Sequence, residues 1–202
     1  MKLETGTFTL TKAELKAVMA FASTDGTREH LNCVLFDGSA GAVIATDGHT
    51  LIRCNGMPPC PSEAAYAVPL AGLKQAYALL RKDAHLLEVT SCIASSGRTC
   101  VVMRARDGAV CLGSVEVTLD PDVLDFPPYL ACIPQPGISG ELDNGVAVNA
   151  DYLTRVALVG KATSSWHSGV KLVGCSGELA PILFRVESRD LNADVVIMPM
   201  RM

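Results

Sequence analysis

The chain has 202 residues, of which 49% are hydrophobic and 19% charged, and its formal net charge is −4. This composition excludes an intrinsically disordered chain, and the length allows one or two domains with a sizeable core. The total charge does not indicate a nucleic-acid partner, although a polyanion responds to the local charge of one face rather than to the total.

A repeated pattern divides the chain into three similar segments, which begin at Phe8, Tyr66 and Val146. Each segment opens with a short strand-like alternation and continues through a capping residue into an amphipathic helical pattern. Three β-like runs follow each helix: 30–36, 41–47 and 50–54; 85–92, 98–105 and 108–115; 169–174, 181–187 and 193–199. The predicted unit is therefore βαβββ, used three times. The predicted fold class is α+β, with helices on one face of antiparallel sheets.

The start of each predicted helix carries a recognisable signal. The helices are expected over residues 11–24, 69–82 and 149–162. Thr11 and Glu14 have the spacing of a capping box. Pro69 suits the first helical position, where its missing N–H has no partner to lose, and Asn149 is a favourable N-cap.

The spacing of the repeats predicts the domain organisation. Thr11 and Pro69 are 58 residues apart, whereas Pro69 and Asn149 are 80 apart, and the excess of 22 matches the stretch 118–139. That stretch holds five of the eleven prolines, which is typical of a connector. We therefore expect a complete domain of two repeats over residues 1–117, a connector over 118–139 and a half-size domain over 140–202.

The predicted helices are locally basic on an acidic protein. They contain seven of the 17 lysines and arginines, namely Lys12, Lys16, Lys74, Arg81, Lys82, Arg155 and Lys161. Lys12 and Lys16 share one flank of the first helix, and Lys74 and Arg81 lie on the corresponding flank of the second. Solvated lysines on amphipathic helices are the simpler interpretation. The repetition favours a surface that faces the backbone of duplex DNA without reading its sequence.

The segment "ATDGHTL", residues 45–51, presents Asp47 and His49 as a candidate acid–base pair, with Cys54 or Cys60 as a nucleophile. Nothing in the sequence supplies an oxyanion hole or a phosphate loop, so we expect no enzymatic activity. In the alternative interpretation Asp47 caps a turn, Gly48 supplies a positive φ, and the residues do no chemistry.

The eight cysteines form no CxxC pair, and no pair of histidines has zinc-finger spacing, so neither a metal nor another cofactor is expected. Most cysteines lie in apolar runs and are expected in the core. The start of the chain lacks the apolar segment of a signal peptide, and no apolar run reaches about 18 residues. We therefore expect a cytoplasmic protein without a membrane partner.

Four landmarks together resemble one family. "HLNCVLFDGSAGAVIATDGHTL", residues 30–51, is similar to the middle domain of the bacterial replicative sliding clamp, the beta subunit of DNA polymerase III. "VPLAGLKQAYALL", "FPPYLACIP" and the C-terminal "VVIMPMRM" resemble a helix, a connector and the tail of that family, in the same order. The resemblance implies the DNA-clamp (processivity) fold, with helices lining a central hole. It also implies a sliding clamp that encircles double-stranded DNA and tethers partner proteins without catalysis.

The resemblance also implies a hydrophobic pocket for short peptide motifs of DNA polymerases and the clamp loader. The positions that match are Leu31, Thr46, Gly48, His49, Leu51, Pro127, Cys132, Val196, Met198, Pro199, Met200, Arg201 and Met202. Thr50 and Ala131 depart from the pattern, since the family carries arginine at both places.

The larger departure is length, because the family has three full domains per chain. Rings of this family carry twelve inner helices, so a chain with three helices would need four copies. We therefore expect a homo-oligomer, with a tetrameric ring as the first hypothesis and a dimer that pairs the half-domains as the second. A clamp mimic or adaptor, which binds clamp partners without encircling DNA, remains the alternative function.

Overall fold

The computed structural model describes residues 3–56, 65–83, 85–94, 97–119, 126–134, 146–163, 169–174, 180–188 and 191–200. The first repeat consists of β1 (Leu3–Thr11), α1 (Lys12–Met19), the short 3-10 helix η1 (Glu29–Leu31), β2 (Cys33–Asp37), β3 (Ala42–Thr46) and β4 (Thr50–Asn55). The second consists of β5 (Ala65–Pro69), α2 (Leu70–Leu79), β6 (Leu86–Ile93), β7 (Thr99–Asp107) and β8 (Val110–Thr118). After the 3-10 helix η3 (Tyr129–Cys132) come α3 (Ala150–Lys161), β9 (Lys171–Gly174), β10 (Ile182–Glu187) and β11 (Asn192–Ile197).

These elements confirm the three predicted helices and the nine strands that follow them. The capping box is present, because the Thr11 hydroxyl accepts the Glu14 N–H at 3.1 Å and the Glu14 carboxylate accepts the Thr11 N–H at 2.7 Å. Asn149 caps α3 through the Asp151 N–H. The helices are shorter than predicted, and no helix among the described residues is long and apolar enough to span a membrane.

One predicted element is wrong. Residues 146–149, expected as the opening strand of the third repeat, are irregular. The equivalent strand β5 is held by pairing along its length with β2. At 146–149 the Ala147 carbonyl accepts the Met200 N–H, and the Asn149 carbonyl accepts the Tyr152 N–H at the start of α3. A strand needs a neighbouring strand for its ladder, and these two bonds do not make a ladder.

The strands form two antiparallel sheets. One has the order β1-β6-β7-β8, and the other has the order β5-β2-β3-β4-β11-β10-β9. Because β1 pairs with β6, the first two repeats exchange a strand and share one core. The seven-stranded sheet joins the first repeat to the third through the pairing of β4 with β11.

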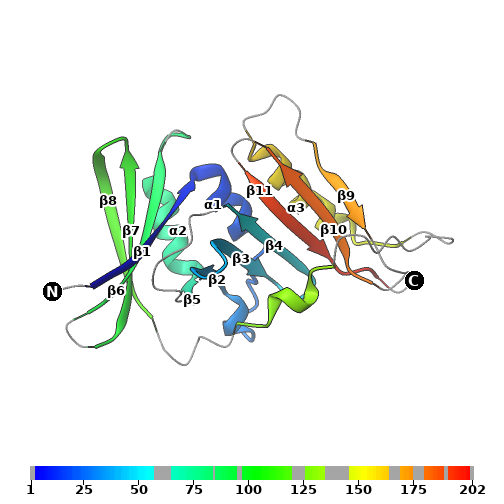
Figure 1. Ribbon diagram of the computed structural model, residues 1–202, viewed down its shortest axis with the longest axis horizontal. Helices are drawn as coiled ribbons and strands as arrows, with labels where there is room; N and C mark the ends of the chain where they lie inside the picture. Colours follow the sequence, from blue (N-terminus) through cyan, green and yellow to red (C-terminus); the bar gives the residue numbers. More distant parts are fainter. Residues whose placement is uncertain are drawn as a thin grey trace.

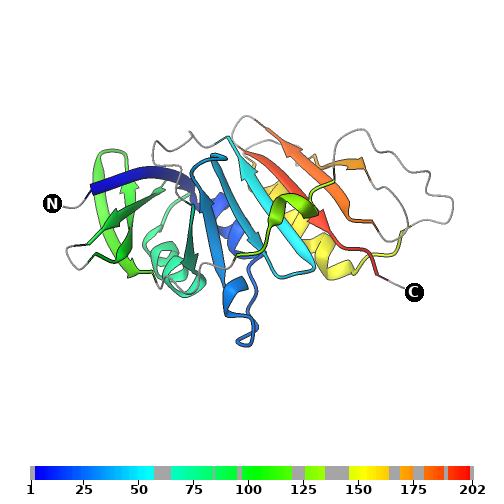
Figure 2. The same ribbon diagram turned by 60° about the horizontal axis from the view of Figure 1, so that its bottom comes forward.

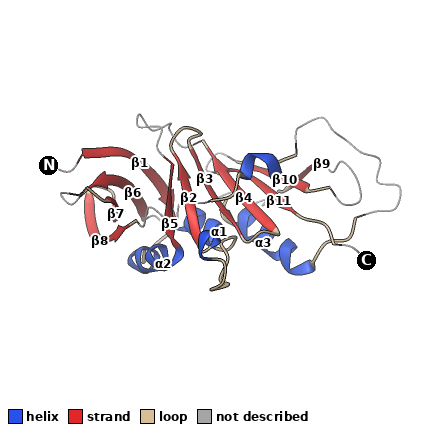
Figure 3. Cartoon of the chain, turned by 90° about the horizontal axis from the view of Figure 1, so that it is seen from below, coloured by secondary structure: helices blue, strands red, loops and turns tan. Residues whose placement is uncertain are grey.

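The molecule has two main layers, with α1, α2 and α3 in a row on one side of the sheets (Figure 3). The core between the layers includes Phe8, Leu15 and Leu73, which are almost fully buried. The helix α2 approaches β8 so closely that a Cβ on Gly72 would lie 2.6 Å from a Val117 methyl carbon. This contact explains the glycine there. The connector helix η3 lies on the opposite side of the sheet (Figures 2 and 3).

The two ends of the elongated molecule carry edge strands, β8 at one end and β9 at the other (Figure 1). Val110 and Leu112 on β8 and Leu172 on β9 are large exposed hydrophobic residues. Open edges with apolar side chains are sites at which another chain can add a strand.

Candidate functional site

The TDGH turn connects β3 to β4, and it has the geometry that the sequence predicted, with Asp47 as the cap and Gly48 at a positive φ. The Asp47 Oδ1 atom accepts hydrogen bonds from the backbone N–H groups of His49 at 2.9 Å and Thr50 at 2.7 Å. Gly48 has a φ of 89°, a conformation that strongly favours glycine. Its N–H donates to the Thr46 hydroxyl at 3.1 Å.

This turn also contacts the third repeat in two places. The Met198 N–H donates to the His49 carbonyl oxygen at 2.9 Å, which fixes the chain just after β11. The His49 ring lies against the Tyr152 ring of α3, with centroids 6.2 Å apart and an interplanar angle of 30°. The turn is therefore the point at which the first repeat, the third helix and the C-terminal segment meet.

Arg155 of α3 completes the turn's charge network. Its Nη1 atom lies 2.6 Å from Asp47 Oδ2 and 2.7 Å from the Thr50 hydroxyl oxygen. Burial alone raises the pKa of Asp47. The N–H groups of Thr50 and His49 and the Arg155 guanidinium together outweigh it, so the pKa lies below its ordinary value of 3.8. Asp47 is consequently an ionised acceptor whose two oxygens are engaged by the turn and by Arg155.

The substitution Asp47→Asn tests this electrostatic role, because it keeps an oxygen for the turn and removes the charge that faces Arg155. We expect a loss of about 1–3 kcal/mol in the free energy of unfolding at pH 7. A carboxyl whose pKa is lowered on folding stabilises above its unfolded pKa and loses that contribution as the pH falls. The difference between wild type and variant should therefore shrink below about pH 4 in urea titrations. A difference that stays constant down to pH 3 contradicts it.

A second apolar cluster lies on the outer face of the seven-stranded sheet. Leu51 and Val196, both predicted pocket residues, are paired across β4 and β11 and are buried in this cluster. Tyr129 of η3 covers them, and its hydroxyl donates to Asp37 Oδ2 at 2.8 Å. Burial, and to a smaller extent this hydrogen bond to Asp37, raises the pKa of Tyr129 to about 12. Figure 2 shows η3 over β4 and β11.

The other predicted pocket residues surround this cluster to different degrees. A Cβ on Gly48 would lie 3.8 Å from a Leu31 methyl carbon, so the Leu31 side chain lies next to the turn. Pro127 and Cys132 lie in the connector, and Cys132 is exposed. Met198 and Met200 are exposed on either side of Pro199, while Arg201 and Met202 lie outside the described residues. The structure thus brings the turn, the connector and the segment after β11 to one region.

Tyr152 and Tyr129 belong to this region and were missed in the sequence. Tyr152 follows the N-cap Asn149 by three residues, which places its ring near the start of α3 and the TDGH turn. The proline-rich composition of the connector favoured a linker, although "PPYL" contains an aromatic residue that a solvated linker does not need.

The predicted DNA-facing residues divide into exposed and engaged groups. Lys16, Lys74, Arg81, Lys82 and Lys161 are exposed. Lys12 lies 3.7 Å from the Asp83 carboxylate and 5.9 Å from the centre of the Tyr77 ring. Arg155 differs most from the prediction, because its guanidinium is bound to the TDGH turn. The sequence placed its charge on the helix surface, whereas the partly buried carboxylate of Asp47 attracts it to the junction.

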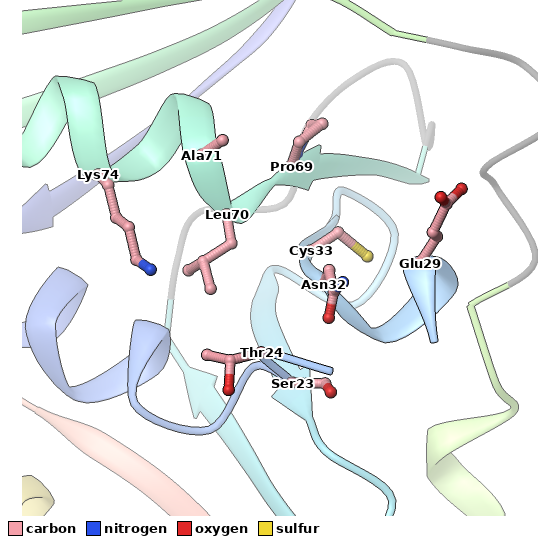
Figure 4. A pocket seen from close by; sticks show the side chains of 9 residues that line it. All are labelled: Ser23, Thr24, Glu29, Asn32, Cys33, Pro69, Leu70, Ala71 and Lys74. Carbon is pink, nitrogen blue, oxygen red and sulfur yellow. The ribbon is translucent and has the colours of Figure 1, made fainter. Parts of the chain in front are cut away.

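A groove of about 460 Å³ lies between the segment that follows α1, the 3-10 helix η1 and the start of α2 (Figure 4). Its polar lining includes Ser23, Thr24 and Asn32, and the Leu70 N–H donates to the Asn32 carbonyl at 2.9 Å. Lys74 and Glu29 are the charged residues that line it, so their charges offset each other. Figure 4 shows the Lys74 amine directed into the groove.

Most of the cysteines that the structure describes lie in the core, as expected, and two do not. Cys33, Cys54, Cys92 and Cys100 are buried as predicted, whereas Cys111 and Cys132 are exposed. The predictions for Cys60 and Cys175 fall outside the described residues. Burial raises the pKa of the Cys54 thiol well above its ordinary value. A protonated, inaccessible thiol does not fit the role of a nucleophile.

Comparison with solved structures identifies the fold. Similar chains are a DNA polymerase sliding clamp from Pseudomonas aeruginosa (TM-score 0.64, 19% identity, 99% of this chain and 67% of that chain) and one from Bacillus subtilis (0.65, 17%, 100% and 66%). A third is the DNA polymerase III beta subunit from Thermotoga maritima (0.65, 15%, 98% and 66%). The chain therefore has the sliding-clamp fold, as the sequence predicted, and spans about two thirds of the length of these clamps. No protein-family model and no curated protein sequence matches it.

Proposed function

We propose that the protein is a sliding clamp, a processivity factor that encircles double-stranded DNA and tethers partner proteins. The observation that carries this proposal is the sliding-clamp fold over 97–100% of the chain, with the TDGH turn, the connector and the segment after β11 gathered in one region. A closed ring stays on DNA by topology, so its contacts with the duplex do not need to be tight.

The helix layer supports the DNA-facing half of the proposal. Its exposed cations Lys16, Lys74, Arg81, Lys82 and Lys161 lie on or next to the three helices that share one side of the molecule (Figure 3). Such cations attract phosphates without reading bases, so binding should weaken steeply with salt. Arg155 and Lys12 are left out of this surface because acidic side chains already engage them.

The outer region supports the partner-binding half. Leu51 and Val196 are buried beneath Tyr129, and Met198 and Met200, which follow β11, are exposed beside this cluster. Methionine side chains are flexible and polarizable, which suits a site that accepts several related peptides. We infer that polymerase and clamp-loader peptides bind here, with His49 at the rim.

The edge strands support self-association. A chain with three inner helices closes a ring only with other copies, and β8 and β9 expose unpaired edges with apolar side chains at opposite ends. Different edges at opposite ends favour a head-to-tail arrangement, which closes into a ring when the rotation between copies permits. Four copies would give the twelve helices expected above.

The decisive experiment separates topology from affinity. The protein is diluted to dissociate its oligomers, concentrated again with nicked circular plasmid, and passed through a gel-filtration column in high salt. We expect co-elution with the circle and release after one restriction cut, together with an oligomer mass by light scattering. A monomer at micromolar concentration contradicts the ring. An oligomer that binds partner peptides but never stays on circles indicates the clamp mimic or adaptor.

A further inference from the structure

Arg155 joins two parts of the chain that are 108 residues apart in sequence. It belongs to α3 in the helix layer, yet its guanidinium reaches the β3–β4 turn on the other side of the junction. It contacts Asp47 at 2.6 Å and the Thr50 hydroxyl at 2.7 Å, while Thr50 is only 2% exposed. A charge-assisted pair at these distances, largely shielded from water, is stronger and more directional than a surface ion pair.

The network around Arg155 engages both carboxylate oxygens of Asp47 and the Thr50 hydroxyl. Asp47 Oδ1 accepts the N–H groups of His49 and Thr50 and the Thr50 hydroxyl, and Oδ2 accepts Arg155. The Thr50 hydroxyl therefore donates to Asp47 and accepts from Arg155. On its other side, the guanidinium lies 5.7 Å from the centre of the Tyr152 ring, which also contacts His49.

Two features make this network more than a generic ion pair. It includes Asp47, which accepts the backbone N–H groups of exposed His49 and buried Thr50, and the same turn holds Met198 through the His49 carbonyl. Without Arg155, Oδ2 of Asp47 loses its ionic partner at a side chain that is only 15% exposed in the intact network. We therefore expect the turn to rearrange, because a shielded carboxylate oxygen without a partner is unfavourable.

We propose that Arg155 is a positioning residue, which holds the TDGH turn from α3 and thereby sets the rim of the partner-binding region. The effect on peptide binding rests on the proposed function above. The effect on the turn does not, because it follows from the contacts alone. Thr50 is uncharged, and the Arg155 guanidinium, which belongs to another repeat, places a positive charge beside its hydroxyl.

The test compares Arg155→Met, which keeps an unbranched side chain without charge, with Arg155→Lys, which restores a cation. The matched control is Arg106→Met in the four-stranded sheet. It removes an ion pair in which Arg106 Nε lies 2.8 Å from Glu88 Oε2, and the Arg106 side chain is about as exposed as that of Arg155. Hydrogen exchange of the His49, Thr50 and Met198 amides reports the turn. Fluorescence polarisation with a labelled polymerase tail peptide that binds bacterial sliding clamps reports the rim.

We expect Arg155→Met to speed exchange at these three amides and to weaken peptide binding, each about tenfold or more, with Arg155→Lys recovering part of both. Arg106→Met should change neither by more than about twofold, even if it lowers the melting temperature equally. Unchanged exchange in Arg155→Met overturns the proposal, and so does an equal effect of Arg106→Met. If the wild type binds no peptide, the proposed pocket fails, while the exchange data still decide whether Arg155 holds the turn.

Discussion

Phe36→Ala is expected to lower the free energy of unfolding by about 3–5 kcal/mol, one of the largest single-residue effects in this chain. Phe36 stacks on Tyr66 with ring centroids 5.4 Å apart and meets Phe8 edge to face at 5.3 Å. Phe8 belongs to the four-stranded sheet, whereas Phe36 and Tyr66 belong to the seven-stranded sheet. The substitution therefore leaves a cavity where the two sheets meet.

Urea denaturation measures this loss, and Phe36→Leu serves as the matched control. Leucine keeps most of the apolar volume but loses the aromatic geometry, so we expect a cost of less than half that of alanine. If alanine costs no more than about 1 kcal/mol, the aromatic cluster is not the structural centre that these distances indicate.

The second large effect is expected from Met198→Asp combined with Met200→Asp. The pair places two charges at the edge of the apolar partner region, after the end of β11, so the sheet should persist. We expect at least a hundredfold loss in affinity for the polymerase tail peptide, equivalent to about 2.7 kcal/mol, because charges would oppose an apolar contact. Fluorescence polarisation measures the affinity, and light scattering checks that the oligomer is unchanged.

The control for this variant is Leu86→Asp. Leu86 and Met198 are both 38% exposed, but Leu86 lies in the four-stranded sheet and far from the partner region in the fold. It should leave peptide affinity unchanged. A normal affinity in the double methionine variant, or an equal loss in Leu86→Asp, shows that peptides bind elsewhere.

The fold was predictable because its signals are local. Alternating apolar residues marked the strands, and Thr11 and Asn149 marked where helices begin. The strand expected at 146–149 failed for the opposite reason. A strand depends on a partner elsewhere in the chain, and periodicity cannot tell whether that partner is present.

The site was predictable only in part. The TDGH turn has a geometry that Asp47 and Gly48 determine by themselves, so its shape followed from sequence. The contact of Arg155 with that turn depends on the pairing of β4 with β11, which brings distant segments together. A basic residue on an amphipathic helix gives no sign of which carboxylate it will meet. The sequence therefore could not show that the Arg155 guanidinium lies at the TDGH turn.

The strand exchange between the first two repeats also governs the order in which the chain can mature during synthesis. β1 is made first, but its partner β6 begins 75 residues after Thr11, and Leu3 pairs with Ile93. The edge of β4 stays unpaired for longer, since Thr50 pairs with Ile197, which is made much later. Two strand edges thus leave the ribosome before their partners exist, and a chain of high contact order folds slowly. Until β11 emerges, the edge of β4 stays unpaired and open to association with other chains.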